Sequence, residues 1–392
     1  MSIYLIDGAR TAFASFGGAL ANVKADDLGA ATAIEAMKRS KVNPSDIDHV
    51  IYGNVIHSST NASFLSRHIA LKAGVPVEVP AFNVNRLCGS GSQSVVSAAQ
   101  MILLNEAELV LAGGAENMSM APYANFTSRF GGNKLGSVSY EDMVLSTLTD
   151  EYAGSGMGLT AERLASQYSI TREEQDEFAL LSQQRAGKAR DEGIFSKEIV
   201  AVEVSHKKGT LVVSEDEHIK AEVTSEKLAS LRPSFKKDGT VTAGNSSGIN
   251  DGAASVIVGS EKAVNELGLT PLAKIVSWGI AGVDPTIMGI GPVPAIKKAL
   301  LKADLSLEDM DLIEINEAFA AQYLSVEKEL GLDRRKTNVN GGAIALGHPV
   351  GASGTRILLS LAYSLKERGL KYGVASLCIG GGQGIAVIIE SL

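Results

Sequence analysis

The sequence predicts an α/β fold made of two related halves, with a more exposed domain inserted in the first. Short apolar runs typical of strands buried on both faces alternate with helical patterns in residues 1–118 and 251–392. The motifs of residues 1–118 return in the same order in residues 251–392, as in a duplicated unit. Residues 119–250 are more polar, with patterns typical of surface helices. We therefore expect a mostly parallel sheet that is covered on both sides.

The composition argues against several classes of function. The net charge of −8 and the lack of a long basic run argue against nucleic-acid binding. Two cysteines cannot form a disulfide framework, and six scattered histidines lack metal-ligand spacing. No apolar run reaches the length that spans a membrane. Residues 1–8 are typical of a strand rather than a leader or transit peptide, so a cytoplasmic location is expected.

Hydrophobic periodicity predicts the elements of each part in order. In the first half they are a strand at 3–6, a helix at about 27–39, a strand ending near 54, a helix at about 89–104 and a strand at 108–114. The inserted domain is expected to contain surface helices within 160–192. In the second half they are a strand at 253–259, a helix at 294–303, a strand within 309–317, a helix starting at 351–355 and a closing strand pair at 374–379 and 384–390.

One of the two cysteines, Cys88, lies where an extended segment turns into a small-residue helix, in Asn85-Arg86-Leu87-Cys88-Gly89-Ser90-Gly91. A thiol at a helix N-terminus faces unpaired backbone N–H groups and the positive end of the helix dipole. Both favour the thiolate, so the position predicts a lowered pKa and a nucleophilic cysteine. The alternative is a buried structural cysteine, which is the commoner role of a lone cysteine.

The duplication supplies a partner for this thiol. The position that matches Cys88 in the second half lies near His348, just before the Pro-Val-Gly start of a helix. The two side chains are therefore expected to face each other, as a thiol nucleophile and its base do. The other five histidines are expected to be structural.

Two further strand ends carry polar groups. Cys378 lies at a strand end in Cys378-Ile379-Gly380-Gly381-Gly382, where the glycines let backbone N–H groups approach a substrate carbonyl. Asn316 lies in Asn316-Glu317-Ala318-Phe319 at another strand-to-loop junction, where its amide can position a water or a carbonyl. A purely structural role for these residues is the less favoured interpretation, because both cysteines and one histidine occupy glycine-rich strand-end loops.

Throughout its length the sequence resembles the thiolases, a family that contains acetyl-CoA acetyltransferases and 3-ketoacyl-CoA thiolases. The resemblance rests on the Cys88 motif, Asn316-Glu317-Ala318-Phe319, residues 340–354 and Cys378-Ile379-Gly380, and it begins at Asp7-Gly8-Ala9-Arg10-Thr11. It implies a five-layered α-β-α-β-α thiolase fold of two duplicated halves, residues 1–118 and 251–392. Residues 119–250 would form an inserted loop domain that binds CoA and contributes to a homotetramer or homodimer.

The resemblance also implies a two-step Claisen reaction in which two molecules of acetyl-CoA give acetoacetyl-CoA and CoA. Cys88 would carry the acyl group as a thioester, with His348 as its activating base, and Cys378 would remove the α-proton of acetyl-CoA. One oxyanion hole would use His348 and a water held by Asn316. The other would use the backbone N–H groups of Cys88 and Gly380. The thioester provides the activation, so we expect no metal and no permanently bound cofactor.

By the same resemblance, coenzyme A would lie across the inserted domain, along Arg232-Pro233-Ser234-Phe235 and residues 242–248. The residues carried over as contacts of CoA and of its acyl end are Met157, Lys220, Phe235, Ala243, Ser247, Met288, Ala318 and Phe319. Packing in the core is the alternative role for Met288 and Phe319. Four lysines add positive charge for the anionic nucleotide: Lys207, Lys208, Lys236 and Lys237.

Three alternatives remain open. A degradative 3-ketoacyl-CoA thiolase would run the same chemistry toward cleavage of longer chains. A β-ketoacyl synthase shares the fold but pairs its cysteine with two histidines, or with histidine and asparagine, and the Cys378 loop argues against it. A non-catalytic lipid or acyl-CoA carrier would not need both cysteines, His348 and Asn316. Gly156-Met157-Gly158 opens space where short-chain members often have His-Met-Gly, whereas residues 119–145 favour the short-chain type.

Overall fold

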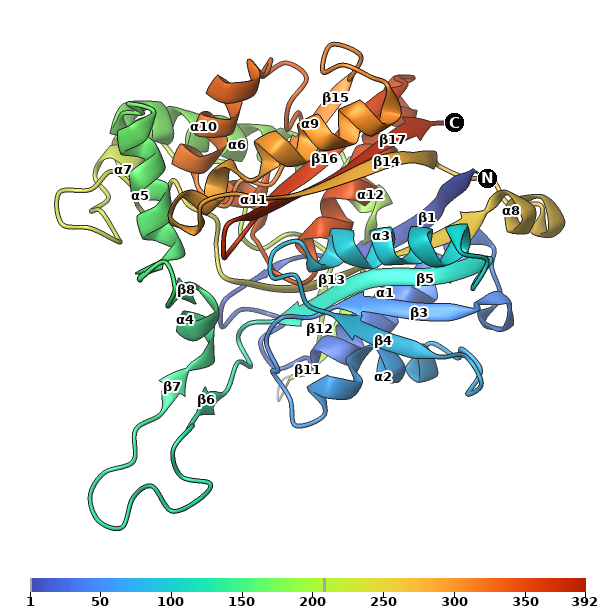
Figure 1. Cartoon of the computed structure of the whole chain (residues 1–392), viewed down its shortest axis with the longest axis horizontal. Coiled ribbons are helices and arrows are strands. Elements are labelled where there is room, and N and C mark those ends of the chain that lie inside the picture. The colour runs from blue at the N-terminus through green and yellow to red at the C-terminus, as the bar shows by residue number, and fades with distance from the viewer. Residues whose placement is uncertain (1, 207–208) are drawn as a thin grey trace.

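The computed structural model describes residues 2–206 and 209–392, so Lys207 and Lys208 lie outside the described residues. The chain forms a large mixed sheet covered by helices (Figure 1). The first half contains β1 (Ile3–Thr11), β2 (Ala14–Ser15), α1 (Ala25–Ser40), β3 (His49–Gly53), α2 (Leu65–Lys72), β4 (Ala81–Val84), α3 (Ser90–Leu103) and β5 (Leu109–Asn117).

After a long insertion, β13 (Asn250–Ser260) returns to the sheet. The elements that follow are α8 (Glu261–Leu267), β14 (Ala273–Gly282), α9 (Pro292–Ala303), β15 (Leu312–Ile315), α10 (Ala320–Leu330), α11 (Ala343–Leu346), α12 (Ser353–Arg368), β16 (Tyr372–Ile379) and β17 (Gln383–Ser391). A 3-10 segment, η4 (Pro285–Ile290), precedes α9. Most elements predicted from periodicity are present, whereas the elements α2, α8, β14, α10 and α11 were not predicted.

The strand order of the sheet is β15-β16-β17-β14-β1-β13-β5-β3-β4, with β2 and β10 (Ile199–Val200) beside β13 and β1. Read outward from the β14–β1 junction, the two sides correspond, because β14, β17, β16 and β15 mirror β1, β13, β5 and β3. Within the described residues β1 and β14 pair only at Tyr4–Lys274 and Leu5–Ala273. The two sides therefore diverge into two sheet layers, as expected of duplicated halves.

The sheet is mixed rather than mostly parallel. β3 is parallel to β4 and β5, and β15 is parallel to β16. In the middle of the sheet the strands run β16-β17-β14-β1-β13-β5, and each pair of neighbours in this run is antiparallel. The prediction of a mostly parallel sheet was wrong because continuous apolar runs report burial on both faces but not strand direction.

β13 corrects a second expectation. We expected a strand at 253–259 to open the second half, but β13 pairs with β1 and β5 and is the counterpart of β17. A strand belongs to the layer that supplies its hydrogen-bond partners, so β13 completes the first half. The insertion lies between β5 and β13, and the proposed division at 118 and 250 otherwise stays a prediction.

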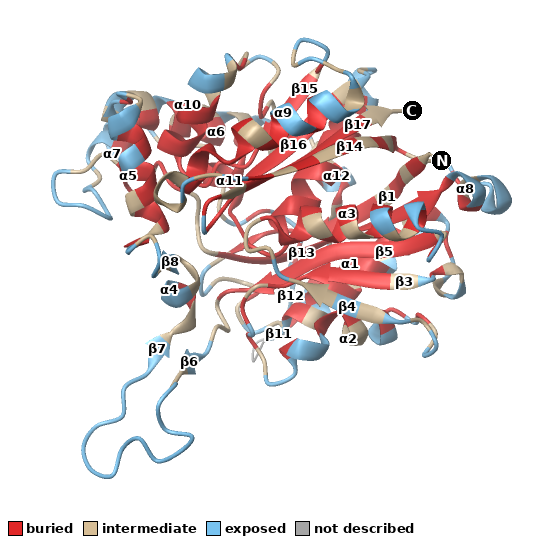
Figure 2. Ribbon diagram, viewed as in Figure 1, coloured by how far each residue is buried: buried red, intermediate tan, exposed pale blue. Residues whose placement is uncertain are grey.

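Helices form three layers around the two sheet layers (Figure 1). α1 covers β1 and β13 on the outer face of the first half, and α9 covers β14 and β17 on the outer face of the second. α3 and α12 lie between the layers, in a core that joins Val95 and Val256 to Ile357 and Val387. Figure 2 shows α12 as mostly buried, whereas α3 also carries intermediate and exposed residues toward its C-terminal end. The fold is the five-layered α-β-α-β-α arrangement that the resemblance implied.

The first turns of α3 and α12 are bonded to each other. Ser92 Oγ donates to the Gly354 carbonyl at 3.2 Å, and Thr355 Oγ1 donates to the Gly91 carbonyl at 3.0 Å. A Cβ on Gly354 would lie 2.3 Å from the backbone nitrogen of Ser92, so this approach requires glycine. These reciprocal contacts bring the loops before both helices to one place.

Within the described residues the insertion forms several small strands, two long helices and two short ones. The strands are β6 (Tyr123–Ala124), β7 (Glu141–Asp142), β8 (Thr149–Asp150), β9 (Ser155–Gly156), β10, β11 (Val202–His206) and β12 (Gly209–Val213). The helices are α4 (Met143–Thr147), α5 (Met157–Gln167), α6 (Arg172–Asp191) and α7 (Ser225–Ala229), of which α4 is a single short turn. α5 and α6 pack on α10 of the second half. The other elements lie nearer the surface.

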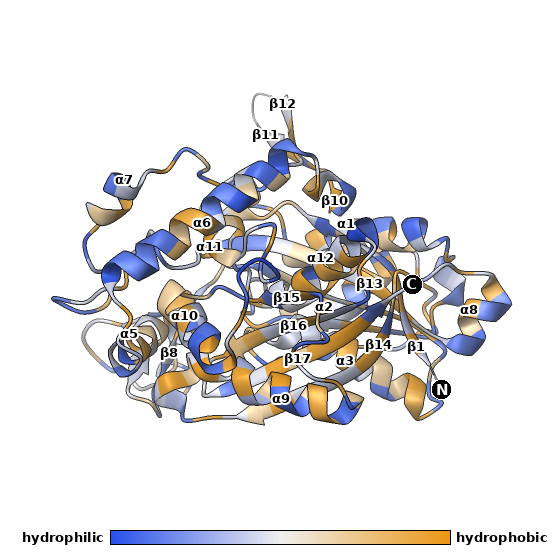
Figure 3. Ribbon diagram, turned by 90° about the horizontal axis from the view of Figure 1, so that it is seen from above, coloured by the Kyte–Doolittle hydropathy of each residue, from blue (hydrophilic) through white to orange (hydrophobic). Residues whose placement is uncertain are grey.

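Two parts of the insertion project from the body. The β11–β12 hairpin extends beyond α6, whose visible face is largely hydrophilic (Figure 3). A long arm, residues 122–142, contains β6 and β7 and is exposed along its length (Figures 1 and 2). Within it Phe130 and Leu135 are 95% and 98% exposed. Among the described residues, no helix is long and apolar enough to cross a membrane.

Candidate active site

Cys88 lies in the turn between β4 and α3, which local hydrogen bonds close tightly. Asn85 Oδ1 accepts from the Leu87 N–H at 3.0 Å. Ser90 Oγ accepts from the Arg86 N–H at 2.8 Å and donates to the Leu87 carbonyl at 2.6 Å. Leu87 has a φ of 46°, a left-handed conformation that is unfavourable for a residue with a side chain. The strained turn holds Cys88 immediately before the helix start.

The electrostatic surroundings of Cys88 differ from the prediction. The residue is half-buried, but protein atoms surround its sulfur, and this burial raises the pKa of the thiol to about 11. The backbone N–H groups of Gly380 and Cys88 lower this pKa, and the Glu116 carboxylate raises it further. The expected lowering of the pKa was therefore wrong in sign, because desolvation of the thiolate outweighs its hydrogen-bond donors. Activation at neutral pH requires a base.

Cys378 ends β16 close to this turn. A Cβ on Gly380 would lie 3.3 Å from Leu87 Cδ1 and 3.3 Å from Met157 Sδ, so the loop after β16 lies against the Cys88 turn. Cys378 is 1% exposed. Burial raises the pKa of its thiol well above the usual range, and a charge on Cys88 raises this pKa further. The two thiols, which come from opposite halves, therefore lie close together.

His348 is held in a defined tautomer. Ser353 Oγ lies 2.6 Å from His348 Nδ1 and donates its own proton to the Pro349 carbonyl at 2.9 Å. Its lone pairs therefore accept from Nδ1–H, which leaves Nε2 without a proton. Burial, with the Arg356 charge as a second cause, lowers the pKa of His348 to about 3. The imidazole is thus neutral over the physiological pH range, with a free nitrogen that can accept a proton.

Asn316 lies beside this free nitrogen. Its Nδ2 is 3.4 Å from His348 Nε2, and its Oδ1 is buried without a hydrogen-bond partner. A buried amide oxygen without a partner is unfavourable unless a water or ligand completes it. The geometry therefore fits a water on Asn316 next to His348.

The two segments predicted to contact CoA form one hairpin-like unit. Pro233 pairs with Thr242, and the Ser234 N–H donates to the Val241 carbonyl at 2.9 Å. Residues 242–248 continue to the second half, where the Ser247 N–H donates to the Ala318 carbonyl at 2.9 Å. The unit thus reaches from the insertion to the Asn316 loop.

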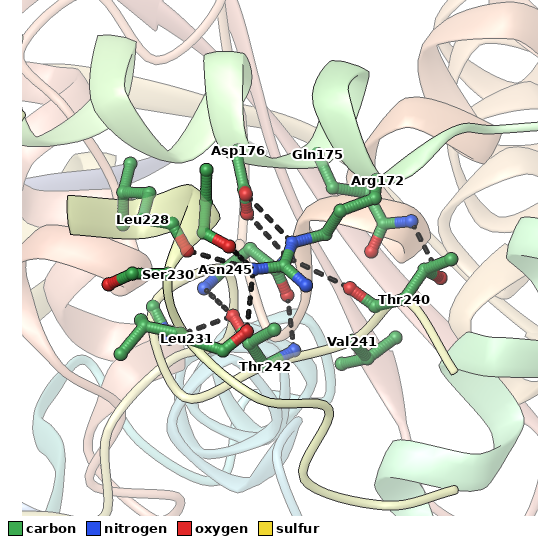
Figure 4. Close-up of polar contacts among 12 residues, drawn as sticks. Arg172, Gln175, Asp176, Leu228, Ser230, Leu231, Thr240, Val241, Thr242 and Asn245 are labelled. Carbon is green, nitrogen blue, oxygen red and sulfur yellow. Dashed lines mark hydrogen bonds and ion pairs between the residues drawn. The ribbon is translucent and has the colours of Figure 1, made fainter. Parts of the chain in front are cut away.

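A buried polar cluster supports this unit from α6 (Figure 4). Asp176 accepts from Arg172 Nε at 2.7 Å and from Asn245 Nδ2 at 2.9 Å. Arg172 Nη2 donates to the Leu228 and Leu231 carbonyls at 2.8 and 2.9 Å. Asn245 Oδ1 in turn accepts from the Thr242 N–H at 2.8 Å. The cluster links α6, α7 and the 240–245 loop, which holds the predicted CoA segment in place.

The predicted apolar contacts gather next to Cys378. The buried cluster on this side of the sheet contains Met157, Met288, Ala318, Phe319 and Cys378. Phe235 is 43% exposed and meets Phe319 edge-on, with ring centroids 5.9 Å apart. It also covers Gly158, where a Cβ would lie 2.2 Å from the Phe235 ring. Burial of Met288 (3%) and Phe319 (9%) shows that both also pack in the core.

The remaining predicted contacts lie at the rim. Ala243 is exposed and Ser247 is half-buried on the same loop. Lys220 is exposed beside α6, where its N–H donates to Gln183 Oε1 at 2.7 Å. Burial lowers the pKa of His218, and the Lys220 charge lowers this pKa further. The His218 ring lies against Gly248. The structure brings all of these residues to the same side of the insertion, with Lys220 the most peripheral.

Two family models match this chain. The family model for the N-terminal domain of thiolase matches residues 3–262, and that for the C-terminal domain matches residues 269–391. The chain belongs to the thiolase family. The first match extends past β13, in agreement with its place in the first half.

Individual relatives are similar over their full length. The mitochondrial 3-ketoacyl-CoA thiolase of Homo sapiens is 54% identical over 390 residues, which are 99% of this chain and 98% of the relative. The acetyl-CoA acetyltransferase of Escherichia coli (strain K12) is 51% identical over 389 residues, again 99% and 98%. The crystal structure of human mitochondrial 3-ketoacyl-CoA thiolase in complex with CoA aligns with a TM-score of 0.96 at 52% identity and covers 100% of this chain and 98% of that chain.

Sequence reasoning missed three residues that position the polar groups of this thiolase. Asn250 is fully buried, accepts from the His348 N–H at 3.0 Å and donates to the Ala14 carbonyl at 3.0 Å. Ser353 sets the His348 tautomer, and Glu116 bonds several backbone groups near Cys88. A polar residue at the edge of an otherwise apolar strand was the available signal for Asn250 and Glu116. Ser353 gave no signal beyond its place at a helix start.

Proposed function

We propose that this thiolase is an acetyl-CoA C-acetyltransferase, which reversibly condenses two molecules of acetyl-CoA to acetoacetyl-CoA and CoA. The observation that carries the proposal is that two thiols from opposite halves lie close together, near a neutral imidazole whose Nε2 carries no proton. His348 is two residues before Val350, which belongs to a hydrophobic cluster that Cys88 packs against. One thiol can hold an acyl group while the other removes a proton. The name of the Escherichia coli relative supports the short-chain reaction.

In the first step His348 Nε2 takes the proton of the Cys88 thiol, and the thiolate attacks the carbonyl carbon of acetyl-CoA. The tetrahedral intermediate expels CoA as a thiolate, which takes the proton of the Cys378 thiol. This leaves an acetyl thioester on Cys88, a thiolate on Cys378 and the first proton on His348 Nε2. The N–H groups of Cys88 and Gly380 already lower the pKa of the Cys88 thiol, so both point toward this sulfur. They are suited to bind the thioester oxygen as its negative charge develops.

In the second step Cys378, as a thiolate, removes the α-proton of a second acetyl-CoA. Its raised pKa makes that thiolate a strong base, as a weakly acidic C–H requires. The enolate oxygen would be stabilised by His348 and a water on Asn316, whose Oδ1 lacks a partner. The enolate carbon attacks the acetyl thioester, a C–C bond forms, and the Cys88 thiolate leaves and takes its proton back from His348 Nε2.

Coenzyme A in this proposal follows residues 232–235 and 242–248, with Lys220 near its phosphates. Its thioester supplies the chemical activation, so the enzyme needs no permanently bound cofactor or metal. Protein treated with EDTA and dialysed should keep full activity. Restoration of lost activity by an added metal ion would contradict this part of the proposal.

Substitution of each thiol tests the assignment. Cys88→Ala should abolish both the acetyl adduct on the protein and the formation of acetoacetyl-CoA, as followed by intact-protein mass spectrometry and absorbance. Cys378→Ala should still form the adduct on Cys88, whereas condensation should fall by about 10³-fold, because the base for the second step is lost. Acetyl transfer that survives in Cys88→Ala would rule out this nucleophile and favour a carrier role.

A 3-ketoacyl-CoA thiolase acting on longer chains is the second candidate function. The human relative at 54% identity bears that name. Gly156, which has no side chain, also leaves more space for the acyl chain than a histidine would. A Cβ there would have the Leu148 carbonyl oxygen, at 3.5 Å, as its nearest neighbour, so a larger side chain could stand where this chain has none. CoA-dependent cleavage of 3-ketoacyl-CoA from four to sixteen carbons separates the two. A kcat/KM that rises beyond four carbons would favour the second candidate.

We also propose a cytoplasmic homo-oligomer. Two free cysteines suit a reducing compartment. Exposed aromatic and aliphatic side chains on the arm, including Phe130 and Leu135, supply an apolar surface for a second copy. Light scattering coupled to size-exclusion chromatography should give the mass of a dimer or tetramer. A monomer at micromolar concentration would contradict it.

A further inference from the structure

Cys88 and His348 reach the site from different halves of the molecule. Cys88 is fixed by the β4–α3 turn, and His348 by the loop before α12. Proton transfer between them requires a defined separation, which neither half can set alone. Glu116 at the end of β5 bonds the loop before α12 to residues 54–56, which follow β3. That segment in turn contacts the Cys88 turn, because Asn85 Nδ2 donates to the Val55 carbonyl at 3.4 Å.

Glu116 is fully buried and accepts four hydrogen bonds. Its Oε1 accepts from Asn54 Nδ2 at 3.0 Å and from the Ile56 N–H at 3.1 Å. Its Oε2 accepts from the Val55 N–H at 3.0 Å and from the Gly351 N–H at 3.0 Å. Three of these donors belong to the first half, whereas Gly351 belongs to the second and lies three residues after His348. The carboxylate therefore bridges the halves.

Three glycines of the first half surround the Gly351 carbonyl. A Cβ on Gly53, Gly91 or Gly114 would lie 2.9, 3.0 or 2.0 Å from the Gly351 oxygen. None of these positions has room for a methyl group without movement of the backbone. We call the three glycines the socket. The turn at Gly351 is thus held at its N–H by Glu116 and at its carbonyl by the socket.

We propose that Glu116, together with the socket, is a positioning residue that sets the separation of Cys88 and His348. The inference rests on the proposed function, because it assumes that Cys88 passes its proton to His348. The Gly351 turn cannot shift without breaking two contacts to the first half. His348, three residues earlier and pinned by Asn250 and Ser353, follows that turn. Burial raises the pKa of Glu116 to about 8, and above that pH its charge also acts on the nucleophile directly and raises the pKa of the Cys88 thiol.

Glu116→Gln tests both effects in the full-length enzyme. The amide keeps the shape but presents an N–H to backbone donors and removes the charge. We expect kcat for acetoacetyl-CoA cleavage to fall by about 10–100-fold, with KM for CoA and acetoacetyl-CoA within about twofold. In the same variant Cys88 should react faster with iodoacetamide between pH 8 and 10, where Glu116 of the parent is charged, because loss of that charge lowers the thiol pKa. A protein that is merely loosened would not combine slower turnover with a lower thiol pKa.

Two further variants keep the test decisive if Glu116→Gln folds poorly. Glu116→Asp retains the charge but shortens the reach, so kcat should fall while the alkylation profile of Cys88 stays unchanged. Gly114→Ala blocks the socket and should likewise lower kcat alone. Asp48→Asn is the matched control, because Asp48 accepts from the Glu108 and Leu109 N–H groups at the opposite end of β5. It should keep the parental kcat.

The proposal is overturned if Glu116→Gln keeps kcat within twofold, or if it loses kcat with an unchanged alkylation profile and Gly114→Ala remains fully active. Mass spectrometry of the acetyl adduct on Cys88 in the parent enzyme separates this outcome from failure of the proposed function. If the parent enzyme forms no adduct, the proposed acetyl transfer to Cys88 is wrong. If the parent forms the adduct but the Glu116 and Gly114 variants keep the parental kcat, only the positioning role is wrong.

Discussion

At the scale of single residues, the protonation state of His348 decides what the site can do. A hydroxyl that is itself committed to the Pro349 carbonyl forces the ring proton onto Nδ1, and burial keeps the imidazole neutral. The duplicated motifs predicted that Cys88 and His348 face each other. They carried no information on the tautomer, which depends on Ser353, nor on desolvation, which reversed the expected direction of the Cys88 pKa.

The depressed pKa of His348 predicts a pH dependence of stability. The folded-state pKa of about 3 lies below the ordinary value of 6.5, so between these values the unfolded chain binds a proton that the folded chain does not. Stability is therefore lost as the pH falls below 6.5. Between pH 7.5 and 5 the loss should be about 2 kcal/mol from this residue. Urea unfolding at both pH values should show a smaller loss in His348→Asn than in the parent.

An exposed histidine provides the control for this measurement. His57→Asn should keep the parental difference between pH 7.5 and 5, since His57 lies at the surface. Equal pH dependence in the parent and in His348→Asn would contradict the buried neutral imidazole. All comparisons need the same protein concentration, because association contributes to apparent stability.

At the scale of elements, the site depends on how two helices begin. The predicted helix starts near 89 and 351–355 were confirmed as the starts of α3 and α12. Small residues in both first turns allow the helices to exchange hydrogen bonds, which places the preceding loops together. The His348 loop needs one more feature, Gly347, whose φ of 95° is open to glycine and strained for other residues. Local sequence therefore predicts the helices, while their contact defines the loops.

Substitution at Gly347 should cost more than backbone strain alone. An added Cβ would lie 2.3 Å from Asn250 Cγ, at a residue pinned by Ala14 and His348. We expect Gly347→Ala to lower the free energy of unfolding by about 3 kcal/mol and to reduce kcat. Gly369→Ala is the matched control, because Gly369 has a φ of 62° with no atom within 4 Å of the added Cβ.

Gly369→Ala should lower the free energy of unfolding by about 1 kcal/mol through backbone strain and should keep the parental kcat. Denaturant unfolding and steady-state kinetics on both variants give the comparison. Equal losses at the two glycines would mean that Asn250 yields to the methyl group and does not fix the His348 loop.

At the scale of the whole molecule, a buried ionic cluster ties the insertion to the sheet. Arg10 on β1 is fully buried and donates to both carboxylate oxygens of Asp216 at 2.6 and 2.8 Å and to Glu198 at 2.6 Å. Asp216 also accepts from the Phe13 N–H at 2.8 Å. These partners lie about 200 residues away in the chain, so the cluster closes the insertion onto the first half. The motif that contains Arg10 was part of the resemblance, but its partners were not predicted.

Removal of this guanidinium should destabilise the whole chain. Arg10→Ala leaves two buried carboxylates without their counter-charge, and we expect a loss of about 3–5 kcal/mol in the free energy of unfolding. Arg335→Ala is the control, because the Arg335–Asp333 pair is exposed and should contribute less than about 1 kcal/mol. Thermal and urea unfolding report both. A loss below 1 kcal/mol in Arg10→Ala would show that the insertion is held by other contacts.

Much of the architecture could be predicted, and the exceptions share a cause. Periodicity located β1, β5, α3 and α12, since burial of one face or of both leaves a pattern in the chain. β17 has no counterpart among the strands predicted within residues 1–118, because its counterpart, β13, follows β5 only after residues 118–249. Pairing across such an insertion, and the direction of each pair, depend on contacts that no local pattern records.

The sequence by itself determined the duplicated α/β plan and the positions of Cys88, His348, Cys378 and Asn316 at loop starts. It also predicted that segments near 232–248 contact CoA. Those features are local or repeated, so the order of residues contains them. The tertiary structure decided which half owns β13, the sign of the Cys88 pKa shift, the His348 tautomer and the bridge from Glu116 to Gly351. Each of these depends on burial and on partners from distant parts of the chain, which exist only once the two halves have packed together.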